Sequence, residues 1–142
     1  MADEEFHHRT VLVTGGSRGL TAIGNAIRFC HALMQANRYE GIRKVINVSG
    51  DGKANDGIAP GIARQLANND DIVVNGLAIL NEDPSLYRYY EMAMIVGPGA
   101  FAHQARNYRD FTAAIKRKLL REIALLMSED ASDQSLAVAS NQ

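Results

Sequence analysis

Short apolar runs alternate along this chain with longer segments in which apolar residues recur every three or four positions. The apolar runs are short and nearly continuous, which predicts buried strands. The longer period predicts helices with an apolar face. We therefore expect strands at residues 10–15, 44–50, 71–80 and 100–105, and helices at residues 22–37, 59–68, 84–95 and 108–127.

The alternation of strand and helix predicts a three-layer α/β sandwich with a mostly parallel sheet. Strands without a polar face indicate that helices cover both sides of the sheet. A helix between the first two strands fits a right-handed crossover, so we expect the strand order 1-2-3-4, with the weak fourth strand at an edge. Residues 1–8 and 128–142 are polar and are expected to form a disordered lead and a disordered tail, which leaves a single domain at 9–127.

Composition and charge narrow the classes of function. The 142 residues carry a net charge of −1, so no overall field attracts nucleic acid or an anionic membrane. The basic stretch KRKLLRE at 116–122 is interpreted as a solvated helix face. The single cysteine, Cys30, allows no intrachain disulfide and no cysteine zinc cluster. The start MADEEFHH is unlike a signal peptide, so for the chain as written we expect a cytoplasmic location and no membrane contact.

Two polar loops follow the first two strands, where parallel α/β sheets bind their ligands. The first loop, TGGSRGLT, resembles the glycine motif of short-chain dehydrogenases, in which Thr14, Gly15 and Gly19 match and Thr21 replaces the last glycine. No tyrosine has a lysine four residues later, so the catalytic pair of that family is missing. A degenerate nucleotide-binding domain that uses the TGGSRG turn therefore stays as the alternative function.

Several motifs in one order carry a second resemblance. They are GLTAIGNAI (19–27), RKVINVSGDGKANDG (43–57), VVNGLAIL (73–80) and the long stretch from YYEMAMIVGPGAFAHQ to KLLREIA (89–124). Together they resemble the C-terminal part of a bacterial family of uncharacterised proteins with a von Willebrand factor type A-like domain, over about residues 19–125. The resemblance implies a truncated version of that Rossmann-like α/β fold.

Many domains of that type carry a metal-ion-dependent adhesion site built from three loops. Carried over to this chain, Thr21 takes the threonine position and Asp51 takes the aspartate position. The Asp-x-Ser-x-Ser pattern of the first loop is absent, and Ser17 offers one hydroxyl in its place, next to the opposing charge of Arg18. The resemblance thus implies that Ser17, Thr21 and Asp51 lie together at the carboxyl edge and hold Mg²⁺, Mn²⁺ or Ca²⁺ weakly or not at all. An anion at the backbone N–H groups of this loop is the other possibility.

The sequence shows no nucleophile–base pair and no full metal set, so we expect a function without catalysis. With the resemblance, this predicts a protein-binding module with a degenerate metal site and no cofactor beyond a weakly bound cation. Two strands and a helix of the family's fold are missing, which turns 10–15 into an edge strand with the apolar residues Val11, Leu12 and Val13. Apolar edges pair readily with another chain. We therefore expect a homodimer through this strand or the surface beside it, in addition to a protein partner.

Overall fold

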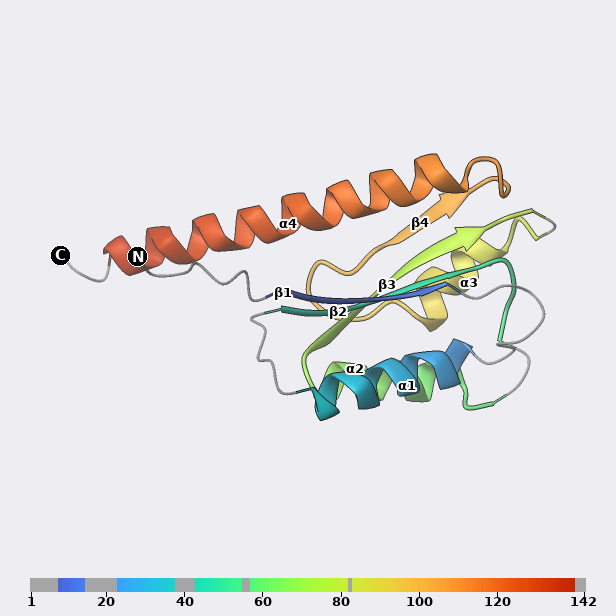
Figure 1. Ribbon diagram of the computed structural model, residues 1–142, viewed down its shortest axis with the longest axis horizontal. Helices are drawn as coiled ribbons and strands as arrows, with labels where there is room; N and C mark the ends of the chain where they lie inside the picture. Colours follow the sequence, from blue (N-terminus) through green and yellow to red (C-terminus); the bar gives the residue numbers. More distant parts are fainter. Residues whose placement is uncertain (1–7, 15–22, 38–42, 55–56, 82, 140–142) are drawn as a thin grey trace.

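Strands and helices alternate along the whole chain (Figure 1). The computed structural model describes residues 8–14, 23–37, 43–54, 57–81 and 83–139. The strands are β1 (His8–Thr14), β2 (Arg43–Gly50), β3 (Ile72–Ile79) and β4 (Ala102–Ala105). The helices are α1 (Ile23–Ala36), α2 (Pro60–Asn69), α3 (Leu86–Ala93) and α4 (Phe111–Ala139).

The four strands form one parallel sheet in the order β1-β2-β3-β4. Within it Val11 pairs with Ile46, Asn47 with Asn75, and Leu77 with His103. The predicted α/β class, the predicted strand order and the edge position of the fourth strand are confirmed. Because the order follows the sequence, the two edges of the sheet are β1 and β4.

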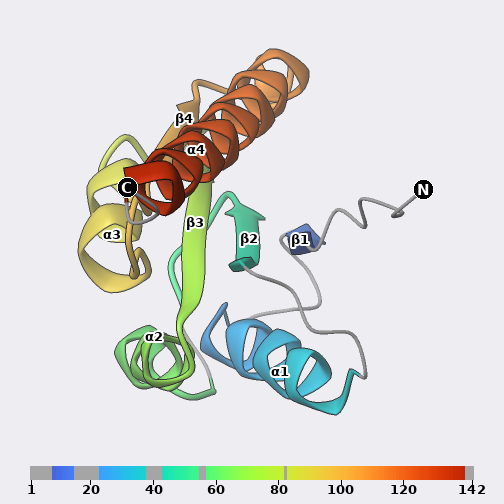
Figure 2. The same ribbon diagram turned by 90° about the vertical axis from the view of Figure 1, so that its left-hand side faces the viewer.

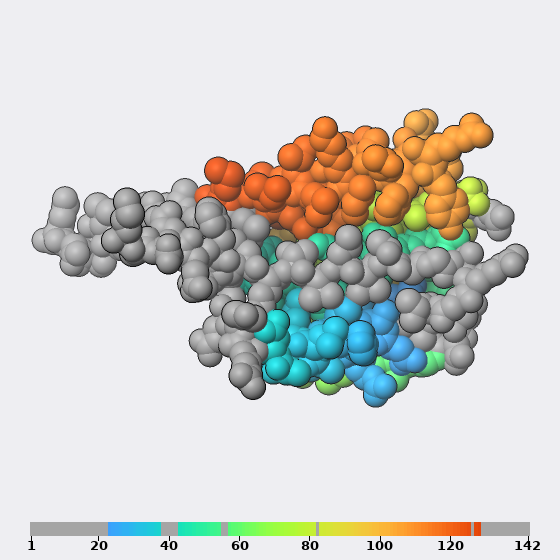
Figure 3. Space-filling view, viewed as in Figure 1, coloured from blue at the N-terminus to red at the C-terminus, as the bar shows by residue number. Residues whose placement is uncertain are grey.

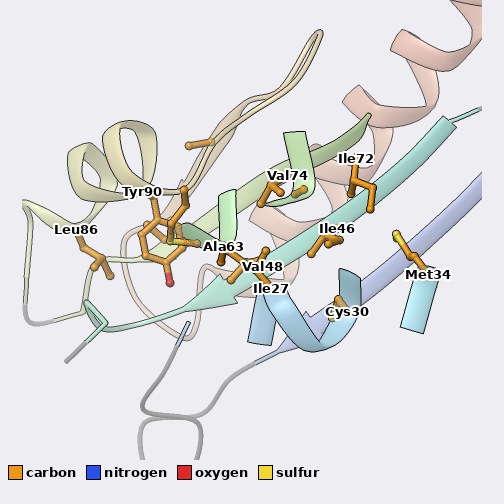
Figure 4. Close-up of a cluster of buried hydrophobic side chains, with 14 residues drawn as sticks. Ile27, Cys30, Met34, Ile46, Val48, Ala63, Ile72, Val74, Leu86 and Tyr90 are labelled. Carbon is orange, nitrogen blue, oxygen red and sulfur yellow. The ribbon is translucent and has the colours of Figure 1, made fainter. Parts of the chain in front are cut away.

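Helices lie on both sides of the sheet (Figure 2). On one side, α1, α2 and α3 enclose the larger apolar core, in which Ile27 and Cys30 of α1 meet Ile46 and Val48 of β2 (Figure 4). On the other side α4 packs through Ala114 onto Leu77, Ile79 and Ala105 in a smaller cluster. Figure 3 shows α4 and α1 along opposite sides of the molecule. In the part of the chain that the structure describes, no helix is long and apolar enough to cross a membrane.

A polar network lies between α4 and the sheet. The Lys118 ammonium, which is fully buried, donates to Asn47 Oδ1 and to Glu122 Oε1. The amides of Asn47 and Asn75 each donate to Glu122 over 3.0 Å, and Asn75 Oδ1 accepts from the Phe101 N–H at 2.9 Å. The interpretation of 116–122 as a solvated face is therefore wrong for Lys118 and Glu122. These two side chains form a buried ion pair between α4 and the sheet.

The end of the last helix also differs from the sequence prediction. The expected helix ends at residue 127 before a disordered tail, whereas α4 continues to Ala139. No glycine or proline occurs after Gly99, so no residue that interrupts a helix is present in this region. At the other end, Asn107 Oδ1 accepts from the N–H groups of Arg109 and Asp110, and this turn delays the helix from the expected 108 to 111. Residues 1–7 of the expected lead lie outside the described residues, and His8 already belongs to β1.

Candidate functional site

Three loops meet at the carboxyl edge of the sheet. They follow β2, β3 and β4, and hydrogen bonds connect the first of them to each of the other two. Parallel strands end at the same edge, so residues that are distant in sequence become neighbours here. This edge holds the only candidate site residue from the sequence that lies within the described ranges, Asp51.

Asp51 comes directly after β2 and is half-buried. Its Oδ2 accepts a hydrogen bond from the hydroxyl of Tyr108, in the turn between β4 and α4. The Tyr108 side chain remains about half exposed, at 53%. The Asp51 carboxylate is therefore accessible to a ligand at the carboxyl edge of the sheet. One of its two oxygens, Oδ2, already accepts a hydrogen bond from Tyr108.

Lys53, Asp83 and Ser85 form a second cluster beside Asp51. The Lys53 ammonium lies 3.0 Å from Asp83 Oδ2 and donates to Ser85 Oγ over 2.8 Å. Asp83 Oδ1 accepts from both the hydroxyl and the N–H of Ser85. These Ser85 hydrogen bonds, with the Lys53 charge, lower the pKa of Asp83 to about 2. Asp83 is thus ionised at neutral pH and compensates the charge of Lys53.

Two buried hydroxyls near this edge have no hydrogen-bond partner among the described residues: Ser49 Oγ and Tyr90 Oη. The Tyr90 ring reaches from α3 across Gly76, where an added Cβ would lie 2.9 Å from Tyr90 Cδ1. Figure 4 shows the ring in the core beside Val48 and Ala63. Burial, followed by the charge of Asp51, raises the pKa of Tyr90. Tyr90 therefore stays a neutral hydroxyl within the field of the Asp51 carboxylate.

The other two predicted site residues, Ser17 and Thr21, lie outside the described residues, so their distance to Asp51 stays a prediction. The start of α1, which follows them, does contact the loop that carries Asp51. Asn25 Oδ1 accepts from the Ile58 N–H at 3.2 Å. Gly24 lies so close to Ile58 that an added Cβ would be 2.0 Å from its carbonyl oxygen. The resemblance places the loop before α1 next to the loop after β2. The contacts of Gly24 and Asn25 with Ile58 join the described residues that adjoin these two loops.

The donor set around Asp51 does not fit a tight cation site in the described part of the chain. There, no group of three or more His, Cys, Asp or Glu side chains lies close enough to hold a metal ion. Mg²⁺ and Ca²⁺ need six or more oxygen ligands. Sequence reasoning missed Tyr108, Lys53 and Asp83, and no local signal identifies them, since Tyr108 is 57 positions from its partner Asp51.

A family model described as "Protein of unknown function (DUF1194)" matches residues 4–127. No curated protein and no solved structure matches the chain.

Proposed function

We propose that this chain, which belongs to the DUF1194 family, is a non-catalytic protein-binding module whose binding surface is the carboxyl edge of its sheet. The observation that carries the proposal is the position of Asp51 at that edge, half-buried and held by Tyr108. Parallel α/β sheets bind their ligands at this edge because the loops that follow the strands converge there. The resemblance to von Willebrand factor A-like domains favours a protein as the ligand.

The proposal includes a degenerate metal site. In the relatives that the resemblance implies, the aspartate of the third loop works together with carboxylate and hydroxyl groups of the first loop. Here the Asp51 carboxylate accepts a hydrogen bond from Tyr108, and Arg18 stands in the first loop. A partner that donates hydrogen bonds or a positive charge to Asp51 suits this arrangement better than a carboxylate bridged by a metal.

Site-directed photocrosslinking tests where the partner binds. A crosslinking residue at Gly52 stands next to Asp51 in open space, since no atom lies within 4 Å of an added Cβ. The control position is Asn69, the exposed last residue of α2, which precedes the amino end of β3 and so lies away from the carboxyl edge. We expect a defined product with a partner protein from Gly52 and none from Asn69. With Asp51→Asn the affinity should fall about tenfold, the equivalent of about 1.4 kcal/mol. Equal products from both positions, or no effect of Asp51→Asn, would contradict the proposal.

Nucleotide binding is the second candidate function. The observation in its favour is that β1 and α1 flank the glycine-rich segment and that β1 pairs in parallel with β2, as a dinucleotide-binding unit requires. Fluorescence of NADPH on titration with the protein separates the two candidates. Enhancement that saturates favours the nucleotide site, and an unchanged spectrum favours the protein-binding module.

We also propose a homodimer through β1. All seven residues of β1 pair with β2 on one side, and β1 is the edge of the sheet on the other. A two-fold axis at this edge would place two β1 strands antiparallel and join the two sheets. Light scattering at about 100 µM protein should give the mass of two chains. A monomer at that concentration would rule the dimer out.

A further inference from the structure

The second edge of the sheet, β4, offers backbone groups for pairing. The carbonyl oxygen of Phe101 accepts from Gly76 N of β3 at 3.0 Å, and that of Ala105 accepts at 2.8 Å from Leu80 N, which directly follows β3. Because successive residues of a strand direct their backbone groups to opposite sides, the N–H and C=O groups of Ala102 and Gln104 point away from β3. Figure 2 shows this edge between α3 and α4.

The α4 side of this edge is positively charged. Burial, and then the charges of Arg121, Arg117 and Lys118, lower the pKa of His103 in β4. Arg121 also lies 4.2 Å from the centre of the Phe101 ring. Lys118 is neutralised by Glu122, but no ion pair joins Arg117 or Arg121 to a carboxylate in the described ranges. Two exposed guanidinium groups thus lie beside this edge without an ion-pair partner among the described residues. The charge of Arg117 also contributes to the lowered pKa of Asp110.

The α3 side of the same edge differs in character. A cavity of about 410 Å³ extends from there to Arg121 of α4, and its other lining residues are Tyr87, Glu91, Ile95, Ala100, Phe101 and Ala102. Its one carboxylate, Glu91, is hydrogen-bonded to the Tyr87 hydroxyl, whose pKa it raises. Beside Glu91, Ile95 and Ala102, this part of the cavity is better suited to a small neutral side chain than to a second carboxylate, which Glu91 would repel.

We propose that the open edge of β4 binds an extended acidic segment of a partner protein by strand addition, at a surface separate from the carboxyl edge. The segment would pair with the outward N–H and C=O groups of Ala102 and Gln104. Side chains of an added strand alternate between the two faces. Those that face α4 would carry carboxylates to Arg117 and Arg121, and those that face α3 would place small apolar groups in the cavity. A free phosphate or a carboxylate metabolite could accept from the guanidinium groups and from a backbone N–H, but it could not pair with the N–H and C=O groups of both Ala102 and Gln104 as a strand does.

The test uses a labelled peptide of alternating glutamate and valine with the full chain, followed by fluorescence anisotropy. Three comparison peptides separate the contributions: one with lysine for glutamate, one N-methylated at the residues that face β4, and one of glutamate and glycine. We expect saturable binding of the first peptide. Reversed charge or N-methylation should weaken it by about tenfold or more, since either change removes contacts worth about 1.4 kcal/mol or more.

Variants of the protein complete the test. Arg117→Gln with Arg121→Gln should weaken the peptide about tenfold. A matched double variant, Arg28→Gln with Lys116→Gln, removes the same charge from exposed positions of α1 and α4 and should leave the affinity unchanged. Asp51→Asn should also leave it unchanged, so this result is independent of the proposed function. Binding that is insensitive to N-methylation, or equally reduced by both double variants, would overturn the proposal, as would the absence of saturable binding.

Discussion

The Lys118 ammonium lies 2.6 Å from the Glu122 carboxylate, one helical turn further along α4, and both side chains are directed at the sheet. Lys118 is 0% exposed and the Glu122 side chain 10% exposed. Asn47 and Asn75, paired across β2 and β3, each donate to Glu122. The ion pair and the two asparagines thus connect this face of α4 to β2 and β3, next to the apolar contacts of Ala114.

Removal of one charge from this pair should destabilise the fold. Glu122→Gln leaves the Lys118 cation buried without compensation, so we expect a loss of about 3–5 kcal/mol in the free energy of unfolding. The double variant Lys118→Met with Glu122→Met removes both charges, so its free energy of unfolding should fall by less than that of Glu122→Gln. Urea denaturation monitored by circular dichroism measures both values. A loss below about 0.5 kcal/mol for Glu122→Gln would show that the pair is not buried in solution.

Two glycines should respond to alanine with opposite sign. Gly24→Ala brings a Cβ to within 2.0 Å of the Ile58 carbonyl oxygen, so α1 must move, at a cost of about 1–3 kcal/mol. Gly61→Ala in α2 meets no atom within 4 Å and should stabilise the protein by about 0.5–1 kcal/mol, because alanine loses less entropy in a helix. Thermal denaturation of the two variants checks this difference. Equal effects would mean that α1 does not pack on Ile58.

The Tyr90 hydroxyl should contribute little to the free energy of unfolding. It is buried and has no hydrogen-bond partner among the described residues. Tyr90→Phe removes the cost of desolvating this group, which is about 1–3 kcal/mol, and keeps the ring over Gly76. We expect an unchanged or higher free energy of unfolding in urea. A marked loss would reveal a partner for the hydroxyl, such as an ordered water.

Asp83 should make the stability sensitive to acid. Its folded-state pKa of about 2 is below the ordinary value of 3.8, so its contribution is fully present above pH 3.8 and disappears as the pH falls through about 2. Ser85→Ala removes the largest cause of this shift, so the pKa of Asp83 should rise towards 3.8. Titration of the carboxyl carbon by NMR measures the change. Asp110, whose pKa Arg106 lowers, is the internal control and should keep its value.

Divalent cations should bind weakly at the carboxyl edge. Asp51 is the one site carboxylate that the resemblance retains, so calorimetry with Mg²⁺ or Mn²⁺ should give dissociation constants in the millimolar range or weaker. Tyr108→Phe frees Asp51 Oδ2 and should not weaken the binding. Micromolar affinity that is lost in Asp51→Ala would show that the first loop supplies the missing ligands.

The sequence predicts the sheet well and the site poorly. The run at 71–80 is mostly apolar, and the run at 44–50 has Val45, Ile46 and Val48 at its centre. Such local patterns, with a helix between the strands, predict β2, β3 and their order. The burial of Lys118 depends on Asn47, 71 positions away, and Tyr108 reaches Asp51 only after the chain has folded. A local sequence pattern predicts that long polar and charged side chains are exposed to solvent. It contains no information on a distant element whose side chains compensate a buried charge.

The arginines beside β4 have a consequence for assembly, because β4 is one of the two edges of the sheet. If two β4 edges met about a two-fold axis, Arg117 and Arg121 of one copy would face the same groups of the other. Like charges at this spacing disfavour edge pairing, much as lysine protects the edges of many natural sheets. The proposed homodimer through β1 avoids this repulsion, and its assembly would close after two copies. A head-to-tail contact of β1 with β4 would instead continue without limit, and the charged edge makes such a fibre less favourable.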